Sequence, residues 1–153
     1  MIALSNIPEQ IEHIDKLNQL AHEVASQAHR NQKRKGTGKP YIVHPEAVAA
    51  QLPVNLKALG FLHDVIEDTA FTLSQMTELF PPWVVERVIM LTRIPNENYD
   101  DYIMRVREDD STRLVKIADL RHNLHDILSG SLRDKYRLAL RLLREDPDAP
   151  FTL

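Results

Sequence analysis

The sequence contains no cysteine, which excludes disulfide bonds and thiolate metal sites. The sequence also lacks a large excess of either charge sign, because 19 basic and 22 acidic residues leave a formal net charge of only -3. The general basic excess that favours nucleic-acid binding is therefore absent. No apolar run approaches the roughly 20 residues of a membrane-spanning helix. The start MIALSNIPEQ lacks the basic region and apolar core of a signal peptide. We therefore expect a cytoplasmic protein with no nucleic-acid or membrane partner.

The length and overall composition are those of an ordinary globular domain. The chain has 153 residues, of which 43% are hydrophobic and 27% are charged. That length fits one domain that spans residues 1–153. The sequence gives no indication of the oligomeric state.

Apolar residues recur at intervals of three and four along most of the chain, which is the spacing of amphipathic helices. No segment shows the alternating pattern of a β-strand, and we find no repeat. We expect an all-α fold, a compact single-domain bundle of about eight helices. The expected helices span about 8–32, 45–52, 55–66, 73–80, 83–92, 96–109, 112–129 and 132–145.

Several helix ends carry local signals. Thr72 and Gln75 have the spacing of a capping box, which opens a helix by satisfying its first amide groups. Gly130 is expected to be the C-cap of one helix, with Ser131 as the N-cap of the next. Gly60 lies inside an apolar helix, where its missing side chain would allow close packing.

The stretch FLHDVIEDT places His63, Asp64, Glu67 and Asp68 within six residues of an apolar segment. On a helix, residues four apart share a face, so these groups form two adjacent columns. Carboxylates in the C-terminal half of a helix oppose its dipole, which indicates a compensating positive charge such as a divalent cation. The alternative is that all four groups are simply solvated.

A metal centre needs ligands from other segments, and two candidates are His44 and Asp119. His44 directly precedes Pro45, and Asp119 lies in RLVKIADLRHNLHDIL, between an expected core face and a polar stripe. Either residue alone is more often structural. With His63 and Asp64 they give two nitrogen and two oxygen ligands, a set suited to Mn²⁺, Fe²⁺, Co²⁺ or Zn²⁺.

The faces of helix 112–129 follow from its periodicity. The expected core face contains Leu114, Ile117, Ala118, Leu124 and Leu128. The expected polar stripe contains Lys116, Asp119, Asn123 and Asp126.

A basic run, HRNQKRKGTGKPY, surrounds a glycine-rich turn. Its five cations are Arg30, Lys33, Arg34, Lys35 and Lys39. Such a loop could grip a small polyanion. The alternative is a solvated helix end, with cations placed favourably near a helix C-terminus.

The order of His44, His63-Asp64 and Asp119 resembles the metal-site pattern of the HD-domain metal-dependent phosphohydrolases, which are all-α. The segments AHRNQKRKGTGKPYIVHP, LHDVIEDT and VKIADLRHN, in that order, resemble the hydrolase domain of the RelA/SpoT family. The matched region runs from about residue 18 to 128. With no segment left for synthetase or regulatory domains, the nearest comparison is a stand-alone small alarmone hydrolase.

The resemblance implies a hydrolase that removes the 3′-pyrophosphate of the nucleotide (p)ppGpp. It implies metal ligation, usually of Mn²⁺, by His44, His63, Asp64 and Asp119. It implies that Glu67 and Asp68 are the catalytic pair. It also implies that Arg34, Lys35 and Asn123 contact the substrate.

The sequence departs from this family in three respects. The glycine turn between Lys35 and His44 carries about one extra residue compared with many members. The stretches from His44 to His63 and from Asp64 to Asp119 are shorter than usual. His125 and Asp126 replace residues that touch the substrate in many members. Two alternatives therefore remain: a related phosphohydrolase acting on another nucleotide, such as a nucleoside di- or monophosphate or NADPH, and a nucleotide sensor without catalysis.

Overall fold

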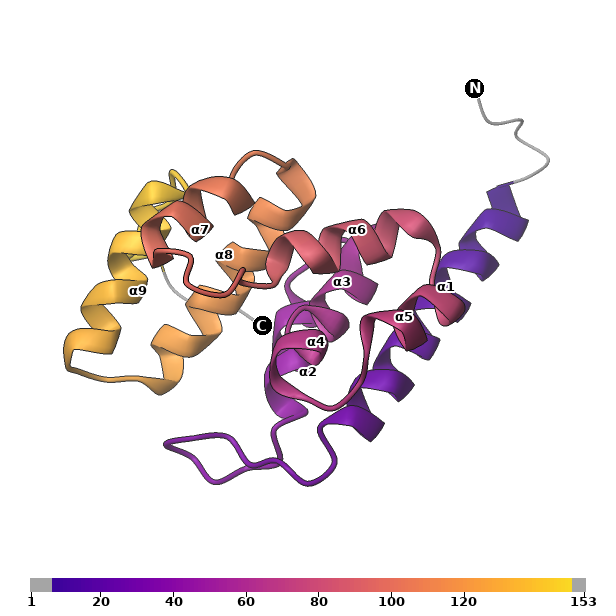
Figure 1. The fold of residues 1–153 in the computed structure, drawn as a ribbon, viewed down its shortest axis with the longest axis horizontal. Coiled ribbons are helices and arrows are strands. Elements are labelled where there is room, and N and C mark those ends of the chain that lie inside the picture. The colour runs from indigo at the N-terminus through magenta and orange to yellow at the C-terminus, as the bar shows by residue number, and fades with distance from the viewer. Residues whose placement is uncertain (1–6, 150–153) are drawn as a thin grey trace.

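The computed structural model describes residues 7–149, which form nine α-helices and one 3-10 helix (Figure 1). The helices are α1 (Ile7–Ala28), α2 (Val43–Ala50), η2 (Val54–Leu56), α3 (Lys57–Leu62), α4 (Val65–Asp68), α5 (Leu73–Leu79), α6 (Pro82–Leu91), α7 (Tyr99–Val106), α8 (Asp110–Asp126) and α9 (Ser131–Leu142). Within residues 7–149 the β-pairing is limited to one isolated bridge, between Lys33 and Pro40. The predicted all-α fold is confirmed.

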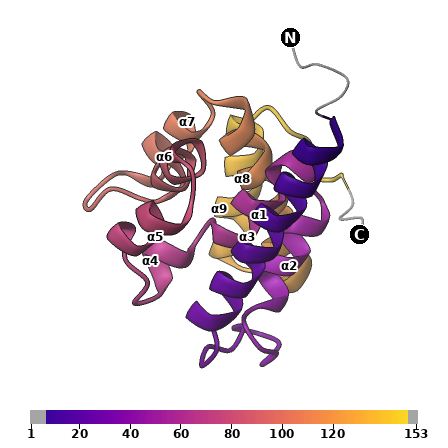
Figure 2. The same cartoon turned by 90° about the vertical axis from the view of Figure 1, so that its right-hand side faces the viewer.

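Helix α3 lies at the centre of the bundle and packs against α1, α2, α6 and α8 (Figures 1 and 2). Helix α8 also packs against α2 and α9, so it joins the two ends of the molecule. The buried apolar side chains are mostly aliphatic, including Leu59, Leu62, Val84, Ile103 and Leu120, and polar residues such as His44, His63 and Asp119 are buried as well. None of the helices described in residues 7–149 is long and apolar enough to cross a membrane.

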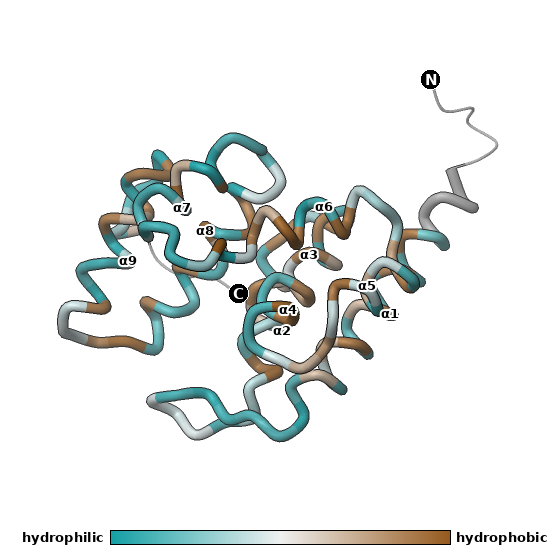
Figure 3. The backbone as a smooth tube through the Cα atoms, in the orientation of Figure 1, coloured by the Kyte–Doolittle hydropathy of each residue, from teal (hydrophilic) through white to brown (hydrophobic). Residues whose placement is uncertain are grey.

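Helix α1 ends at Ala28, earlier than the expected 8–32 range. The chain leaves the helix axis where Gln32 forms hydrogen bonds with residues outside α1. Its carbonyl accepts a hydrogen bond from the Tyr41 amide at 2.9 Å, and its side-chain amide donates to the Asp68 carbonyl at 2.7 Å. The cations of the basic run therefore follow the helix, in a mostly hydrophilic loop between α1 and α2 (Figure 3). The last turn of α1 carries no basic residue, but exposed Arg30 lies two residues beyond it and donates to the Gln27 carbonyl at 3.5 Å. The alternative of a solvated helix end therefore describes Arg30 but not buried Arg34.

The expected helix 55–66 is instead divided at His63 and Asp64, which lie between α3 and α4. Asp64 leaves helical geometry, with φ -122° and ψ 9°. The imidazole of His63 donates from Nδ1 to the Gly60 carbonyl at 2.8 Å, which supplies a partner for a carbonyl at the end of α3. The prediction of two columns on one continuous helix is therefore wrong.

Gly60 allows the close approach of α2 and α3. A Cβ atom at this position would lie 2.8 Å from the Ala49 Cα, a distance that real Cβ atoms do not tolerate. Close packing at Gly60 was expected from the sequence and is confirmed.

The local signals at helix ends have mixed outcomes. Thr72 and Gln75 form the predicted capping box of α5. The prediction for Gly130 is wrong: α8 already ends at Asp126, and Gly130, with φ 98°, is the N-cap of α9. Arg133 explains the difference, because its guanidinium donates to the carbonyls of Leu124 and Ile127 and satisfies the end of α8 without a glycine.

The expected core face of α8 is partly wrong. Leu114 is 41% exposed, and Leu128 is 84% exposed and lies beyond the end of the helix. The buried apolar residues are Val115, Ile117, Ala118 and Leu120. The helix is thus rotated so that the face carrying Asp119 is turned inward.

Candidate metal centre and active site

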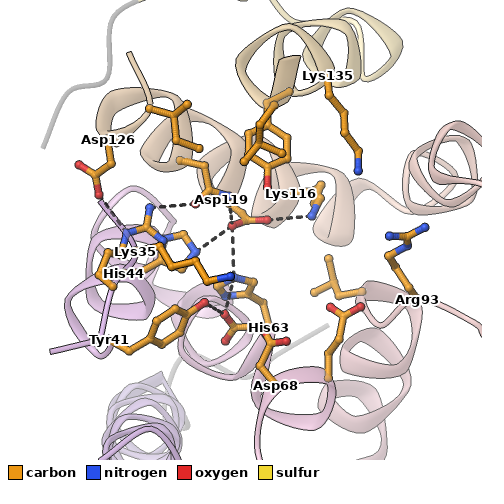
Figure 4. Close-up of a pocket in the computed structure, with 18 of the residues that line it drawn as sticks. Lys35, Tyr41, His44, His63, Asp68, Arg93, Lys116, Asp119, Asp126 and Lys135 are labelled. Atoms are coloured by element: carbon orange, nitrogen blue, oxygen red, sulfur yellow. Dashed lines mark hydrogen bonds and ion pairs between the residues drawn. The ribbon is translucent and has the colours of Figure 1, made fainter. Parts of the chain in front are cut away.

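Three side chains from three elements converge in a pocket of the protein (Figure 4). His44 comes from α2, His63 from the junction of α3 and α4, and Asp119 from α8, and all three are buried. One ligand atom from each lies within 4.8 Å of the others. The Nε2 atoms of His44 and His63 are 2.8 Å and 3.4 Å from Asp119 Oδ1.

These separations suit a bound transition metal. Ligand atoms about 2.0–2.2 Å from a common ion lie roughly 3–3.5 Å from one another. The hydrogen bonds of His63 also fit, since Nδ1 donates to the Gly60 carbonyl and leaves Nε2 to face the carboxylates. Nε2 therefore needs either a proton or a metal ion there. Burial lowers the pKa of His63, but the charges of Asp64 and Asp119 outweigh that and raise it to about 9, so without a metal the proton is held.

Asp119 is oriented by contacts to both carboxylate oxygens. Oδ1 faces the two histidines and accepts a hydrogen bond from Asn123 Nδ2 at 3.1 Å, while Oδ2 pairs with Lys116 Nζ at 2.8 Å. Burial opposes ionisation, yet Lys116 and His63 hold the pKa of Asp119 well below its usual range. The carboxylate is thus ionised and presents one oxygen to the cluster.

Asp64 adjoins this cluster, with its Oδ2 atom 3.6 Å from His63 Nε2. The Tyr41 hydroxyl donates to the same oxygen. His29 Nε2 lies 3.2 Å from Oδ1, a close charge contact without the geometry of a hydrogen bond. Burial raises the pKa of Asp64, but His63 and His29 outweigh it and hold the carboxyl well below its usual range. Asp64 therefore offers a second ionised carboxylate beside the histidines.

The cluster forms the base of a cavity of about 470 Å³. Glu67 and Asp68, both exposed on α4, line the cavity. The cavity wall still removes Asp68 partly from water, and this desolvation, followed by the charges of Asp64 and Glu67, raises the pKa of Asp68 to about 6. This carboxyl therefore exchanges a proton near neutral pH.

The two basic residues predicted to contact substrate lie differently, although both line the cavity. Arg34 is only 8% exposed, and its guanidinium donates to Asp126 Oδ2 at 2.9 Å and to Asn123 Oδ1 at 2.8 Å. Lys35 is exposed. The loop is thus pinned to α8 through Arg34, and Lys35 presents its charge at the opening.

Opposite this loop, the wall contains cations that the sequence analysis missed. Lys135 Nζ lies 4.0 Å from the ring centre of Tyr99, and the Arg93 guanidinium lies 5.4 Å from it. Figure 4 shows both side chains across the cavity from Lys35. No sequence signal marks them, because they lie on segments far apart in the sequence and nothing in SLRDKYR distinguishes Lys135 from its basic neighbours. The sequence places Lys116 in a polar stripe without indicating a role in the site, and no sequence signal marks His29, Tyr41 or His122.

No protein-family model matches this chain, but individual known proteins do. The bifunctional (p)ppGpp synthase/hydrolase SpoT of Escherichia coli is 38% identical over 91% of this chain, and that match covers 21% of SpoT. The guanosine-3′,5′-bis(diphosphate) 3′-pyrophosphohydrolase of Haemophilus influenzae is 38% identical over 74% of this chain and is covered over 19%. The chain thus spans about a fifth of the length of these relatives.

One solved structure shares the fold. It is described as a metazoan ortholog of SpoT that hydrolyses ppGpp, and it superposes with a TM-score of 0.69. The alignment covers 89% of this chain and 88% of the other, at 22% sequence identity. At that identity the likeness establishes a common helical architecture.

Proposed function

Because this chain belongs to the RelA/SpoT hydrolase-like group of HD-type proteins, we propose that it removes the 3′-pyrophosphate of (p)ppGpp, giving GDP or GTP and pyrophosphate. The observation that carries the proposal is the convergence of His44 Nε2, His63 Nε2 and Asp119 Oδ1 at the base of a cavity lined by further acids and cations. Relatives whose names state this activity support the choice of substrate.

The proposed metal ligands are His44, His63, Asp64 and Asp119, and the proposed metal is Mn²⁺. Two imidazoles and two carboxylates without thiolate suit Mn²⁺ and related divalent ions. A bound ion would supply Lewis-acid chemistry, lowering the pKa of water and offsetting phosphate charge. Lys116 and Tyr41 would hold Asp119 and Asp64 in place through the contacts described above.

The proposed catalytic pair is Glu67 and Asp68. Water attacks the phosphorus joined to the 3′ oxygen, that P–O bond breaks, and the 3′ oxygen finishes with a proton. Asp68 suits the role of proton acceptor and later donor, because its pKa of about 6 lies close to neutral pH. Glu67, the neighbouring cavity carboxylate, would orient the water.

The proposed substrate contacts come from both walls of the cavity. Lys35 and the fixed guanidinium of Arg34 would bind phosphate oxygens, and Asn123 would hold Arg34 in place and contact the nucleotide. Arg93 and Lys135 add positive charge on the opposite wall. Cations placed before the reaction offset the charge that develops on the phosphoryl group.

A nucleotide panel with Mn²⁺ tests the proposal. We expect ppGpp to release pyrophosphate, chelation to abolish the activity, and added Mn²⁺ to restore it. Release of orthophosphate from another nucleotide would identify a different phosphohydrolase. Binding of nucleotide without any product would identify a sensor.

A further inference from the structure

We propose that His122 is a positioning residue for His44, accepting the Nδ1 proton of His44 so that the Nε2 lone pair of His44 faces the metal centre. This inference rests on the proposed function, because it takes His44 to be a metal ligand. His122 lies on α8, three residues beyond Asp119, and does not belong to the ligand set.

The two imidazoles are in direct contact inside the protein. The Nδ1 atoms of His44 and His122 are 2.7 Å apart, and the rings are nearly parallel, with centroids 5.0 Å apart. His44 is 1% exposed and His122 is 8% exposed. At this distance the nitrogens must share one proton, so one nitrogen donates it and the other accepts it.

Arg34 determines which nitrogen accepts. Its Nη2 atom lies 3.4 Å from the same Nδ1 of His122. A guanidinium carries only donors, so it faces a lone pair rather than an N–H group. His122 Nδ1 is therefore the acceptor, and the shared proton belongs to His44 Nδ1.

This assignment leaves the lone pair of His44 on Nε2, which lies 2.8 Å from Asp119 Oδ1. A nitrogen lone pair and a carboxylate oxygen that close require a proton or a metal ion between them, as for His63 Nε2, and a bound metal would fill this role. His63 is arranged in the same way, except that its Nδ1 acceptor is the Gly60 carbonyl. A main-chain acceptor is untouched by side-chain replacement, whereas the acceptor for His44 can be removed by mutation.

Calorimetric titration with Zn²⁺ and with Mn²⁺ at one fixed pH tests the role. Second partners of metal-bound histidines typically contribute 10–100-fold in affinity, so we expect His122→Leu to weaken binding by about that factor. His122→Asn should recover most of the affinity, because its side-chain oxygen can accept the same proton. The matched controls are His13→Leu and His13→Asn, on the exposed part of α1, which should bind as the unchanged protein does.

Nitrogen NMR of histidine-labelled protein loaded with diamagnetic Zn²⁺ gives a second readout, which a merely structural role would not fix. We expect His122 to carry its proton on Nε2 and none on Nδ1. A protonated Nδ1 on His122 would overturn the inference, as would unchanged metal affinity in a folded His122→Leu variant. If that variant does not fold, His122→Asn and the NMR assignment decide. Failure of the unchanged protein to bind either metal would instead overturn the metal centre itself.

Discussion

Lys116 Nζ lies 2.8 Å from Asp119 Oδ2, while both histidine contacts of this carboxylate are made by Oδ1. The two side chains are three residues apart on α8 and are 13% and 7% exposed. Burial favours neutral lysine, but the charge of Asp119 outweighs it and raises the pKa of Lys116 well above its ordinary value. Lys116 thus supplies a fixed positive charge beside Oδ2. A metal ion bound at Oδ1 could compensate only part of its loss.

Replacing Lys116 by Met should strongly destabilise the metal-free protein. It removes the lysine partner of the buried Asp119 charge, and breaking a buried ion pair in this way typically costs about 3–5 kcal/mol in the free energy of unfolding. Mn²⁺ should restore part of the loss by binding the native state. Urea denaturation with chelator and with Mn²⁺ measures both effects. The control Lys16→Met, on the surface of α1, should change stability by less than about 0.5 kcal/mol. A loss no larger than that in Lys116→Met would contradict the argument.

The neighbours Arg34 and Lys35 should respond differently to Ala substitution. Arg34→Ala removes the guanidinium that donates to Asp126 Oδ2 and Asn123 Oδ1, so we expect it to raise KM and to lower stability by about 1–3 kcal/mol. Lys35→Ala should raise KM and reduce the salt dependence of nucleotide binding while leaving stability unchanged, because its side chain is exposed.

Steady-state kinetics at two salt concentrations, with thermal melting of the same samples, separates these effects. Lys39→Ala is the control, since Lys39 is exposed on the same loop but does not line the cavity. If Lys35→Ala and Lys39→Ala gave the same KM as the unchanged protein, Lys35 would have no part in substrate binding.

Helices were predictable from the sequence because their apolar spacing is a local property. The break at His63 and Asp64 was not, because the segment has no proline there and its apolar pattern continues into α4. Tertiary contacts accompany the break: His63 contacts His44 and Asp119, and Asp64 accepts a hydrogen bond from Tyr41. The inward rotation of α8 has a similar origin. It places Asp119 in contact with His44 and His63, and such contacts cannot be predicted from the spacing of apolar residues.

The predicted site residues all line one cavity. They could be predicted because the order of their motifs resembles that of a known family, which is information that residue spacing alone does not give. The supporting residues could not be predicted in the same way. Lys116 and His122 act through a partner from the cluster, so their importance depends on distances of 2.8 Å and 2.7 Å that only the folded chain defines. The basic run shows the same limit, since nothing in the sequence distinguishes buried Arg34 from exposed Lys35.

All four tyrosines should titrate above the ordinary phenol range. Burial is the largest cause in each case and raises the pKa of Tyr41, Tyr99, Tyr102 and Tyr136. The folded pKa of each tyrosine exceeds the unfolded value of about 10. The contribution of the neutral phenols to the free energy of unfolding is therefore complete below pH 10 and is lost as pH rises through the folded pKa values. We expect phenolate absorbance to appear at higher pH than in urea and to accompany loss of helical circular dichroism. Titration near pH 10 in a fully helical protein would contradict the burial of these phenols.

The carboxylates Glu67 and Asp68 should be separable from metal binding, since both line the cavity from α4, outside the cluster of His44, His63 and Asp119. The double variant Glu67→Gln with Asp68→Asn keeps the side-chain shape but removes the oxygens that could orient and deprotonate water. We expect kcat to fall about a hundredfold or more, with a far smaller change in Mn²⁺ affinity. Asp68→Asn alone should also remove the acid limb of the pH profile near pH 6, because the pKa of this carboxyl is about 6. Calorimetry with Mn²⁺ and turnover of ppGpp on one preparation provide the measurement. Parallel loss of metal and activity would make these carboxylates ligands or scaffold, whereas full turnover would remove them from the mechanism.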